Sequence, residues 1–300
     1  MIKRRVRKKR VKGKVFGYIP YLPKEYIDKD VYILTDDEHE SFELQQKKVH
    51  LLETFVKVMR EVINHESKRR KMFSIVTETW NPVSGCRHGC IYCWARRRAE
   101  ALKNSERYRE GFKPRLNREE FRKKFNGGLV FITDMGDLWG GWVPPEWIRM
   151  VLNHIRKFDG TYFLFMTKNP ARYFQFLDEI PKNAILGTTI ETNRDDMYVE
   201  KGISGAPVPS DRYRAMKELE WDKKFIAIEP ILDFDLDKFV KWIEEIEPFM
   251  VFVGYDNYNN RLPEPPLQKT KELIRRLSEF TCVIEKTIRP AWNEKQRFLG

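Results

Sequence analysis

Short apolar segments alternate with amphipathic segments along most of this chain, from Phe73 to Glu285. Short buried strands that alternate with helices form right-handed βαβ units around a parallel sheet. The expected strands cover Phe73–Thr77, Leu129–Thr133, Tyr162–Met166, Ala184–Ile190, Lys224–Ile228, Phe249–Val253 and Thr281–Glu285. The expected helices cover Pro145–Phe158, Pro170–Ile180, Asp211–Leu219, Asp235–Ile246 and Pro266–Phe280. The sequence therefore predicts an α/β fold, a partial or full (β/α) barrel of parallel strands as in TIM barrels.

The first seventy residues follow a different pattern. Short β-type pieces between Val11 and Thr35 predict a small N-terminal β unit. Apolar residues at three- and four-residue spacings between Gln45 and Lys68 predict an amphipathic linking helix. The expected parts are a basic arm with the small β unit (1–44), the linking helix (45–71), the α/β barrel (72–290) and a C-terminal tail (291–300).

Positive charge is concentrated at the start of the chain. The net charge is +12, and the first fourteen residues hold nine Lys and Arg and no acid. Because neutralised phosphates release condensed counterions, such an arm predicts contact with nucleic acid. A disordered solubilising tail and an arm docked on an acidic partner are the alternatives. The residues expected to meet nucleic acid are Lys3, Arg4, Arg5, Arg7, Lys8, Lys9 and Arg10.

The overall composition is that of a large soluble enzyme. Hydrophobic residues make up 41% of the chain and charged residues 33%, and no apolar run is long enough to cross a bilayer. Four cysteines in 300 residues, with no signal peptide, do not make a secreted disulfide framework. We therefore expect a cytoplasmic protein with no membrane partner.

Three of the four cysteines form a C-x3-C-x2-C triad, Cys86, Cys90 and Cys93. Three thiolates on one tight loop can hold three irons of a 4Fe-4S cluster, which leaves the fourth iron open to another ligand. A structural zinc site is the alternative, with His88 or the distant Cys282 as the fourth ligand.

This spacing, together with the aromatic Tyr92 before the last cysteine, resembles the signature of the radical S-adenosylmethionine (SAM) enzymes. The resemblance implies that SAM binds the open iron and that an electron from the reduced cluster cleaves it to methionine and a 5′-deoxyadenosyl radical. It also implies an electron donor such as ferredoxin or flavodoxin. The protein's task is then to hold SAM, aim the radical and exclude water and oxygen.

Further motifs resemble an uncharacterised family of radical SAM-like proteins common in phages and prokaryotes. They are Trp80-Asn81-Pro82-Val83-Ser84-Gly85-Cys86, Met135-Gly136-Asp137-Leu138, Thr167-Lys168-Asn169-Pro170, Leu186–Thr192, Glu229-Pro230-Ile231-Leu232 and Val253-Gly254. The chain departs from that family in its shorter cysteine loop and in Tyr255-Asp256 after Gly254. The first departure strengthens the cluster prediction, and the resemblance supplies no substrate.

The resemblance also assigns residues at the strand ends, where α/β barrels bind their ligands. Met135, Gly136 and Asp137 occupy the place of the Gly-Gly-Glu motif that binds the SAM amino group, and the backbone near Tyr92 is expected to lie on adenine. The other expected contacts are Lys168 for the SAM carboxylate or a substrate phosphate, Thr189 and Glu191 for ribose and methionine, and Glu229 for SAM or substrate.

Each of these polar residues also has a structural interpretation. Asp137 can cap a helix, and Lys168 can form an ion pair with Glu191 or Glu229. Glu229 can be the buried partner of Lys168 or Lys286.

Three tryptophans, Trp139, Trp142 and Trp147, follow the expected SAM motif. Core packing beneath the loop is the favoured interpretation, and stacking on bases is the alternative.

Two function classes follow from these features. The first is a radical SAM enzyme that acts on a large anionic substrate, DNA or RNA, in modification or repair. The second is a nucleic-acid-binding protein with a structural or redox-sensing Fe-S or zinc site and no radical chemistry. Polar residues at the ends of so many strands favour the enzyme, because a structural cluster needs no polar barrel mouth.

Overall fold

The computed structural model describes residues 7–11, 14–18, 49–59 and 75–297 of the chain. The chain divides into two units, Met1–Gln46 and Lys47–Gly300. The finer boundaries expected after residues 44, 71 and 290 stay predictions.

A hairpin is described in the first unit. Strand β1 (Arg7–Val11) pairs antiparallel with β2 (Lys14–Tyr18). This confirms the predicted N-terminal β unit, and it shows that part of the basic run is strand backbone. The expected contacts Lys3, Arg4 and Arg5 lie outside the described residues.

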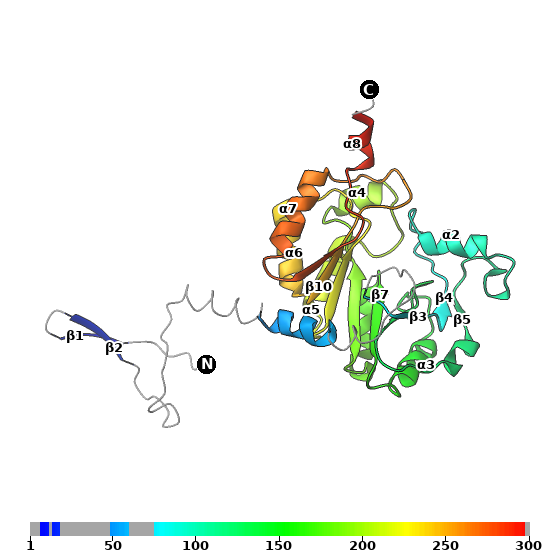
Figure 1. Cartoon of the computed structure of the whole chain (residues 1–300), viewed down its shortest axis with the longest axis horizontal. Coiled ribbons are helices and arrows are strands. Elements are labelled where there is room, and N and C mark those ends of the chain that lie inside the picture. The colour runs from blue at the N-terminus through cyan, green and yellow to red at the C-terminus, as the bar shows by residue number, and fades with distance from the viewer. Residues whose placement is uncertain (1–6, 12–13, 19–48, 60–74, 298–300) are drawn as a thin grey trace. The chain divides into compact units, whose positions relative to one another are not determined.

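Seven parallel strands form the main sheet of the second unit, in the order β11-β10-β9-β8-β7-β6-β3. The strands are β3 (Glu78–Trp80), β6 (Leu129–Ile132), β7 (Tyr162–Thr167), β8 (Ala184–Thr189), β9 (Lys224–Ile228), β10 (Met250–Val253) and β11 (Cys282–Glu285). The predicted α/β fold is confirmed. Because β3 and β11 lie at opposite ends of this order, the barrel is partial (Figure 1).

The first strand of the sheet is displaced from its predicted position at Phe73–Thr77. The observed strand is β3, whose Trp80 pairs with Ile132 of β6. The apolar side chains of Ile75 and Val76 pack into a core cluster instead of extending the strand. Phe73 and Ser74 of the predicted range lie outside the described residues, and the described part of that range, Ile75 to Thr77, precedes the strand.

Helices connect the parallel strands, as the alternating pattern predicts. The main ones are α3 (Pro145–Ile155), α5 (Pro209–Glu218), α6 (Leu236–Ile246) and α7 (Leu267–Leu277). The shorter ones are α2 (Trp94–Ala101), α4 (Asp195–Glu200) and α8 (Trp292–Arg297). Figure 1 shows α6 and α7 side by side. The remaining helices, η2 (Glu106–Tyr108), η3 (Arg118–Arg122) and η4 (Pro170–Glu179), are 3₁₀-helices, so η4 replaces the α-helix expected from Pro170.

The two faces of the sheet belong to two apolar clusters. Alternate strand residues such as Phe165 and Ile228 pack against the helices, in a cluster that includes Ile243 of α6. The intervening residues, such as Leu164 and Phe225, form the cluster on the other face. Burial on both faces is the usual state of a parallel sheet, and it leaves the strand ends to carry polar groups.

A helix over residues 49–59 covers the beginning of the strands. Its Phe55 and Val58 join the second cluster, and the Phe55 ring lies 6.4 Å from that of Phe249, which precedes β10. This helix occupies part of the range predicted for the linking helix. No described helix is long and apolar enough to cross a membrane.

Candidate functional site

The cysteine loop begins at Gly85, directly after the short strand β4 (Val83–Ser84), which pairs with β5 (Arg115–Leu116). Gly85 has φ +87°, and a Cβ there would lie 2.1 Å from the carbonyl oxygen of Lys113. Only glycine fits this position. Its amide donates to the Met135 carbonyl at 2.9 Å, and its carbonyl accepts from the Asp137 amide at 3.4 Å. The start of the loop is thereby fixed to the segment that follows β6.

Cys86, Cys90 and Cys93 line one cavity of about 590 Å³, a volume within the range of small-molecule sites. The expected cofactor residues that also line it are Tyr92, Gly136, Asp137, Lys168, Thr189 and Glu229. Apart from Tyr92, which lies in the cysteine loop, these residues end or follow β6, β7, β8 and β9. The cavity therefore lies at the carboxyl edge of the sheet, where ligands bind in such folds.

Two expected residues lie outside the cavity lining. The side chain of Met135 packs with Ala99 of α2 and with Tyr108, so the backbone of this residue holds Gly85 while its side chain belongs to a small core. Glu191 is fully buried next to the cavity.

Each thiol of the triad meets a donor or a hydroxyl of the chain. Cys86 Sγ accepts from the His88 amide at 3.5 Å, and Cys93 Sγ accepts from the Arg96 amide at 3.4 Å as the N-cap of α2. Cys90 Sγ lies 3.0 Å from the Ser204 hydroxyl. Burial raises the pKa of the Cys86 and Cys93 thiols, so a nearby cation is needed to hold them as thiolates at neutral pH.

The three cysteines line the same cavity. Among the described residues, no group of three or more His, Cys, Asp or Glu side chains is arranged to hold a metal ion. Cys282 begins β11, so it lies at the opposite edge of the sheet from the cavity. Cys282 is not among the residues that line the cavity, so the cavity lining does not favour the alternative in which it is a fourth zinc ligand.

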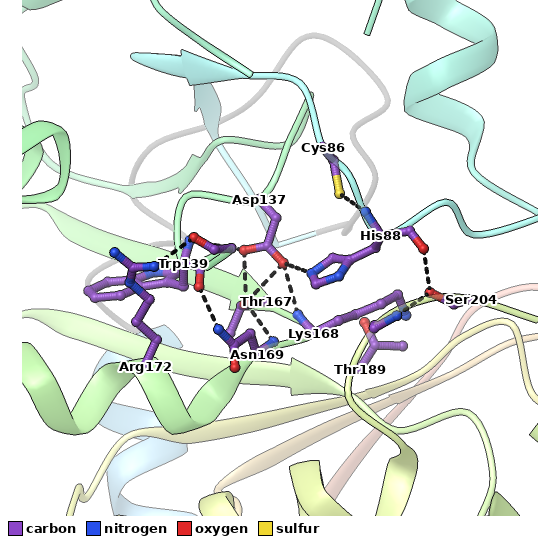
Figure 2. A network of polar contacts seen from close by, with 12 residues as sticks. Cys86, His88, Asp137, Trp139, Thr167, Lys168, Asn169, Arg172, Thr189 and Ser204 are labelled. Carbon is purple, nitrogen blue, oxygen red and sulfur yellow. Dashed lines mark hydrogen bonds and ion pairs between the residues drawn. The ribbon is translucent and has the colours of Figure 1, made fainter. Parts of the chain in front are cut away.

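Asp137 is the centre of a buried polar network (Figure 2). Its carboxylate accepts from His88 Nε2 at 2.9 Å, from the Thr167 hydroxyl at 2.8 Å, from the Lys168 amide at 3.0 Å and from the Trp139 amide at 3.0 Å. These donors fill the four lone-pair sites of a carboxylate. Asp137 therefore ties the cysteine loop to the ends of β6 and β7. The expectation that it caps a helix is wrong, because the residues after it form a turn and the next helix, α3, begins at Pro145.

Glu191 is the centre of a second buried network. It accepts from Lys168 Nζ at 2.5 Å, from Arg212 Nη1 at 2.8 Å and from the Tyr92 hydroxyl. Burial favours the neutral acid, but the charges of Arg212 and Lys168 outweigh it and lower the pKa of Glu191 to about 2. The Lys168 ammonium also lies 5.2 Å from the centroid of the Tyr92 ring. The ion pair anticipated between Lys168 and Glu191 is confirmed.

A second ion pair faces the cavity from the far strands. Lys286, after β11, donates to Glu229, after β9, at 2.5 Å. Burial raises the pKa of Glu229, and the Lys286 charge opposes that rise. Lys168 and Lys286 are the two partners expected for a buried Glu229, and the ion pair with Lys286 is confirmed.

Thr133, at the end of the strand predicted over Leu129–Thr133, lines the cavity, although the sequence assigned it no role. It follows β6 in a left-handed conformation with φ +62°, which is rare for a β-branched side chain. Its buried hydroxyl finds no hydrogen-bond partner among the described residues. No local sequence signal marks such a conformation at a threonine.

The tryptophans after Asp137 pack into the protein. Trp139 is fully buried and makes edge contacts with Phe165 and Tyr173, and Trp142 and Trp147 are partly buried against the same cluster. Core packing, the interpretation favoured from sequence, is confirmed.

The family described as "Protein of unknown function (DUF5131)" matches residues 71–247. Among curated proteins, none matches this sequence.

Solved structures share parts of the fold. A spore photoproduct lyase with bound AdoMet and dinucleoside spore photoproduct is 12% identical, with a TM-score of 0.47, over 67% of this chain and 61% of that one. A second structure of spore photoproduct lyase, complexed with dinucleoside spore photoproduct, is 14% identical, with a TM-score of 0.45, over 71% and 62%. Streptococcus suis SuiB bound to precursor peptide SuiA is 12% identical, with a TM-score of 0.44, over 88% and 58%. The chain thus spans about three fifths of the length of each of these proteins.

Proposed function

Since the chain belongs to the DUF5131 family, whose description names no reaction, we propose a function from the site itself, that of a radical SAM enzyme. Its cofactors are a 4Fe-4S cluster on Cys86, Cys90 and Cys93 and S-adenosylmethionine in the adjoining cavity. The observation that carries this proposal is that all three cysteines of a C-x3-C-x2-C loop line one cavity at the carboxyl edge of a parallel sheet.

The donor set fits the cluster. Three sulfur ligands suit iron–sulfur chemistry, and all three thiols line the same cavity. His88, the other sequence candidate for a zinc ligand, is engaged through Nε2 by Asp137.

When bound, the cluster supplies the electron that cleaves SAM to methionine and the 5′-deoxyadenosyl radical. The chain's own residues are proposed to position SAM and to shield the site from water. Asp137 holds His88 and the Lys168 amide, so it fixes the cysteine loop against the strand ends. The Gly136 backbone lines the space beside that loop, where the SAM amino acid group is proposed to bind.

The polar side chains of the wall are proposed to orient SAM and substrate. Lys168 and Glu229 present one charge each to the cavity, and their partners Glu191 and Lys286 keep those charges in place. Thr189 lines the same wall, and Tyr92 is held by its bond to Glu191. Pre-formed ion pairs cost little reorganisation when a ligand arrives.

The proposed substrate is a nucleic acid, DNA or RNA, in modification or repair. The net charge of +12 and the basic run at the start of the chain support it. The run, from Lys3 to Arg10, is proposed to hold the substrate strand. The electron donor is proposed to be a ferredoxin or flavodoxin, in a cytoplasmic setting.

The test is anaerobic reconstitution with iron and sulfide, followed by dithionite reduction with SAM. We expect a reduced cluster signal in electron paramagnetic resonance that changes on SAM addition, with release of 5′-deoxyadenosine. Both should be lost in Cys90→Ala and kept in Cys282→Ala, the matched control outside the cavity. Stoichiometric zinc, or a cluster indifferent to SAM, would instead indicate a nucleic-acid-binding protein with a structural or redox-sensing site.

A further inference from the structure

An exposed tyrosine lies at the mouth of the cavity. Tyr258 lines the cavity and is 56% exposed, in the loop that follows β10. The buried carboxylate of Asp256 accepts from the amide of Tyr258 at 3.2 Å and from the amide of Asn260 at 2.6 Å. The ring is therefore presented by an ordered turn.

An arginine from the opposite side of the mouth meets this ring. The guanidinium of Arg97, on α2 just after the cysteine triad, lies 5.2 Å from the centroid of the Tyr258 ring and donates to Asn260. Such cation–π contacts stabilise the ring in one orientation. Arg97 covers one face of a ring that stays largely exposed, so the ring keeps an accessible face.

Helix α2 carries charge that the described residues do not neutralise. Arg96, Arg97 and Arg98 follow one another on α2. In the part of the chain that the structure describes, none of the three forms an ion pair with a carboxylate, and the partner of Arg97 is the neutral amide of Asn260. Uncompensated guanidinium groups at a cavity mouth attract anions, and their planar donors suit phosphate oxygens.

We infer that this mouth binds single-stranded nucleic acid, with a base stacked on Tyr258 and an adjacent phosphate at Arg97. An aromatic face accepts any base, and stacking with a basic groove is the usual way to hold a single strand. A base held there is already out of a duplex stack, as chemistry on a base requires. This inference rests on the proposed function for its substrate class and adds the residues that recognise it.

The test uses the full-length protein and a single-stranded oligonucleotide that contains one 2-aminopurine, whose fluorescence is quenched by stacking. We expect the wild type and Tyr258→Phe to quench it on binding. Tyr258→Ala should lose the quenching and bind about tenfold more weakly, and Arg97→Ala should weaken binding with a smaller salt dependence. Phe174→Ala, which removes an exposed aromatic ring on η4 outside the cavity, is the matched control and should behave as wild type.

Binding and quenching in Tyr258→Ala equal to wild type would overturn the inference and leave the basic run as the contact. Absence of binding by any oligonucleotide would also overturn it and make an acidic peptide the better partner. The measurement needs neither cluster nor SAM. It can therefore fail while 5′-deoxyadenosine is still released, or succeed while the radical chemistry fails, so the two proposals are separable.

Discussion

The hydroxyl of Ser204 lies 3.0 Å from Cys90 Sγ, across 114 residues of sequence. The neighbours of Ser204 hold it there, because the Gly205 amide donates to the His88 carbonyl at 2.6 Å and Ile203 accepts from the Ile91 amide at 3.0 Å. The segment after α4 is thereby attached along the cysteine loop. The Ser204 hydroxyl also reaches the His88 carbonyl at 3.2 Å and has one proton to donate. A thiolate at Cys90 can only accept, so in that state we expect Ser204 to donate to Sγ.

Ser204→Ala should therefore lower the reduction potential of the proposed cluster, because a hydrogen bond to a ligand sulfur stabilises the more negative reduced state. The measurement is a redox titration of the reconstituted protein followed by electron paramagnetic resonance. Ser105→Ala, which removes a hydroxyl bonded to the Leu102 carbonyl at the other end of α2, should leave the potential unchanged. Equal potentials for Ser204→Ala and wild type would show that this bond does not tune the cluster.

Thr133→Gly should stabilise the protein by about 1 kcal/mol, since a left-handed β-branched residue stores strain that glycine does not. Urea unfolding measures this. Glu247→Gly is the matched control, because Glu247 is left-handed at the C-cap of α6 and lies away from the cavity. We expect both variants to gain stability. Only Thr133→Gly should bind SAM more weakly, because the Thr133 hydroxyl lines the cavity and has no hydrogen-bond partner among the described residues. Unchanged SAM affinity would mean that the Thr133 hydroxyl does not contact SAM.

Glu191→Gln should destabilise the protein by about 3–5 kcal/mol, because it leaves the fully buried Arg212 without its counter-charge. The double variant Glu191→Gln with Arg212→Met should recover part of that loss in urea unfolding. A double variant as unstable as the sum of the two single variants would show that the pair is not coupled.

The same carboxylate gives a pH dependence. The folded pKa of Glu191, about 2, lies below its unfolded value of 4.5, so its contribution to stability is complete above pH 4.5 and is lost as the pH falls toward 2. The difference in unfolding free energy between wild type and Glu191→Gln should shrink over that window. A difference in unfolding free energy that stays constant over that pH window would contradict a lowered pKa of Glu191.

His154 should make the protein less stable below about pH 6.5. Burial lowers its pKa from 6.5, and the neutral ring lies among Trp80, Phe121 and Phe158 and donates from Nε2 to the Lys123 carbonyl at 2.9 Å. As the pH falls, His154 binds a proton in the unfolded chain before it does so in the folded protein. Its contribution to the free energy of unfolding is therefore fully present above pH 6.5 and is lost as the pH drops toward the folded pKa.

The check is the unfolding free energy of wild type and His154→Gln at pH 7.5 and 5.5. The glutamine keeps a donor but does not titrate, so wild type should lose more stability than the variant between the two pH values. Parallel losses would show that folding does not lower the pKa of His154.

The sequence predicted the parallel sheet and the cavity edge because both depend on local, repeated patterns. Strand ends in βαβ units meet at one edge, which is why Lys168, Thr189 and Glu229 could be grouped without coordinates. Ser204 and Arg212 carry no such signal. Ser204 reaches Cys90 through a loop after α4, and Arg212 meets Glu191 from α5. Contacts of this kind depend on how helices dock, which residue spacing along one chain does not specify.

The helix over residues 49–59 also sets the order of events at the site. Phe55 and Val58 pack into the cluster at the beginning of the strands, whereas the cavity, with Tyr258 in its lining, lies at the strand ends. We expect the proposed cofactor and substrate to enter from that same side. SAM bound after a seated substrate would have to pass it, so steady-state kinetics should be ordered, with SAM adding first and its fragments leaving last.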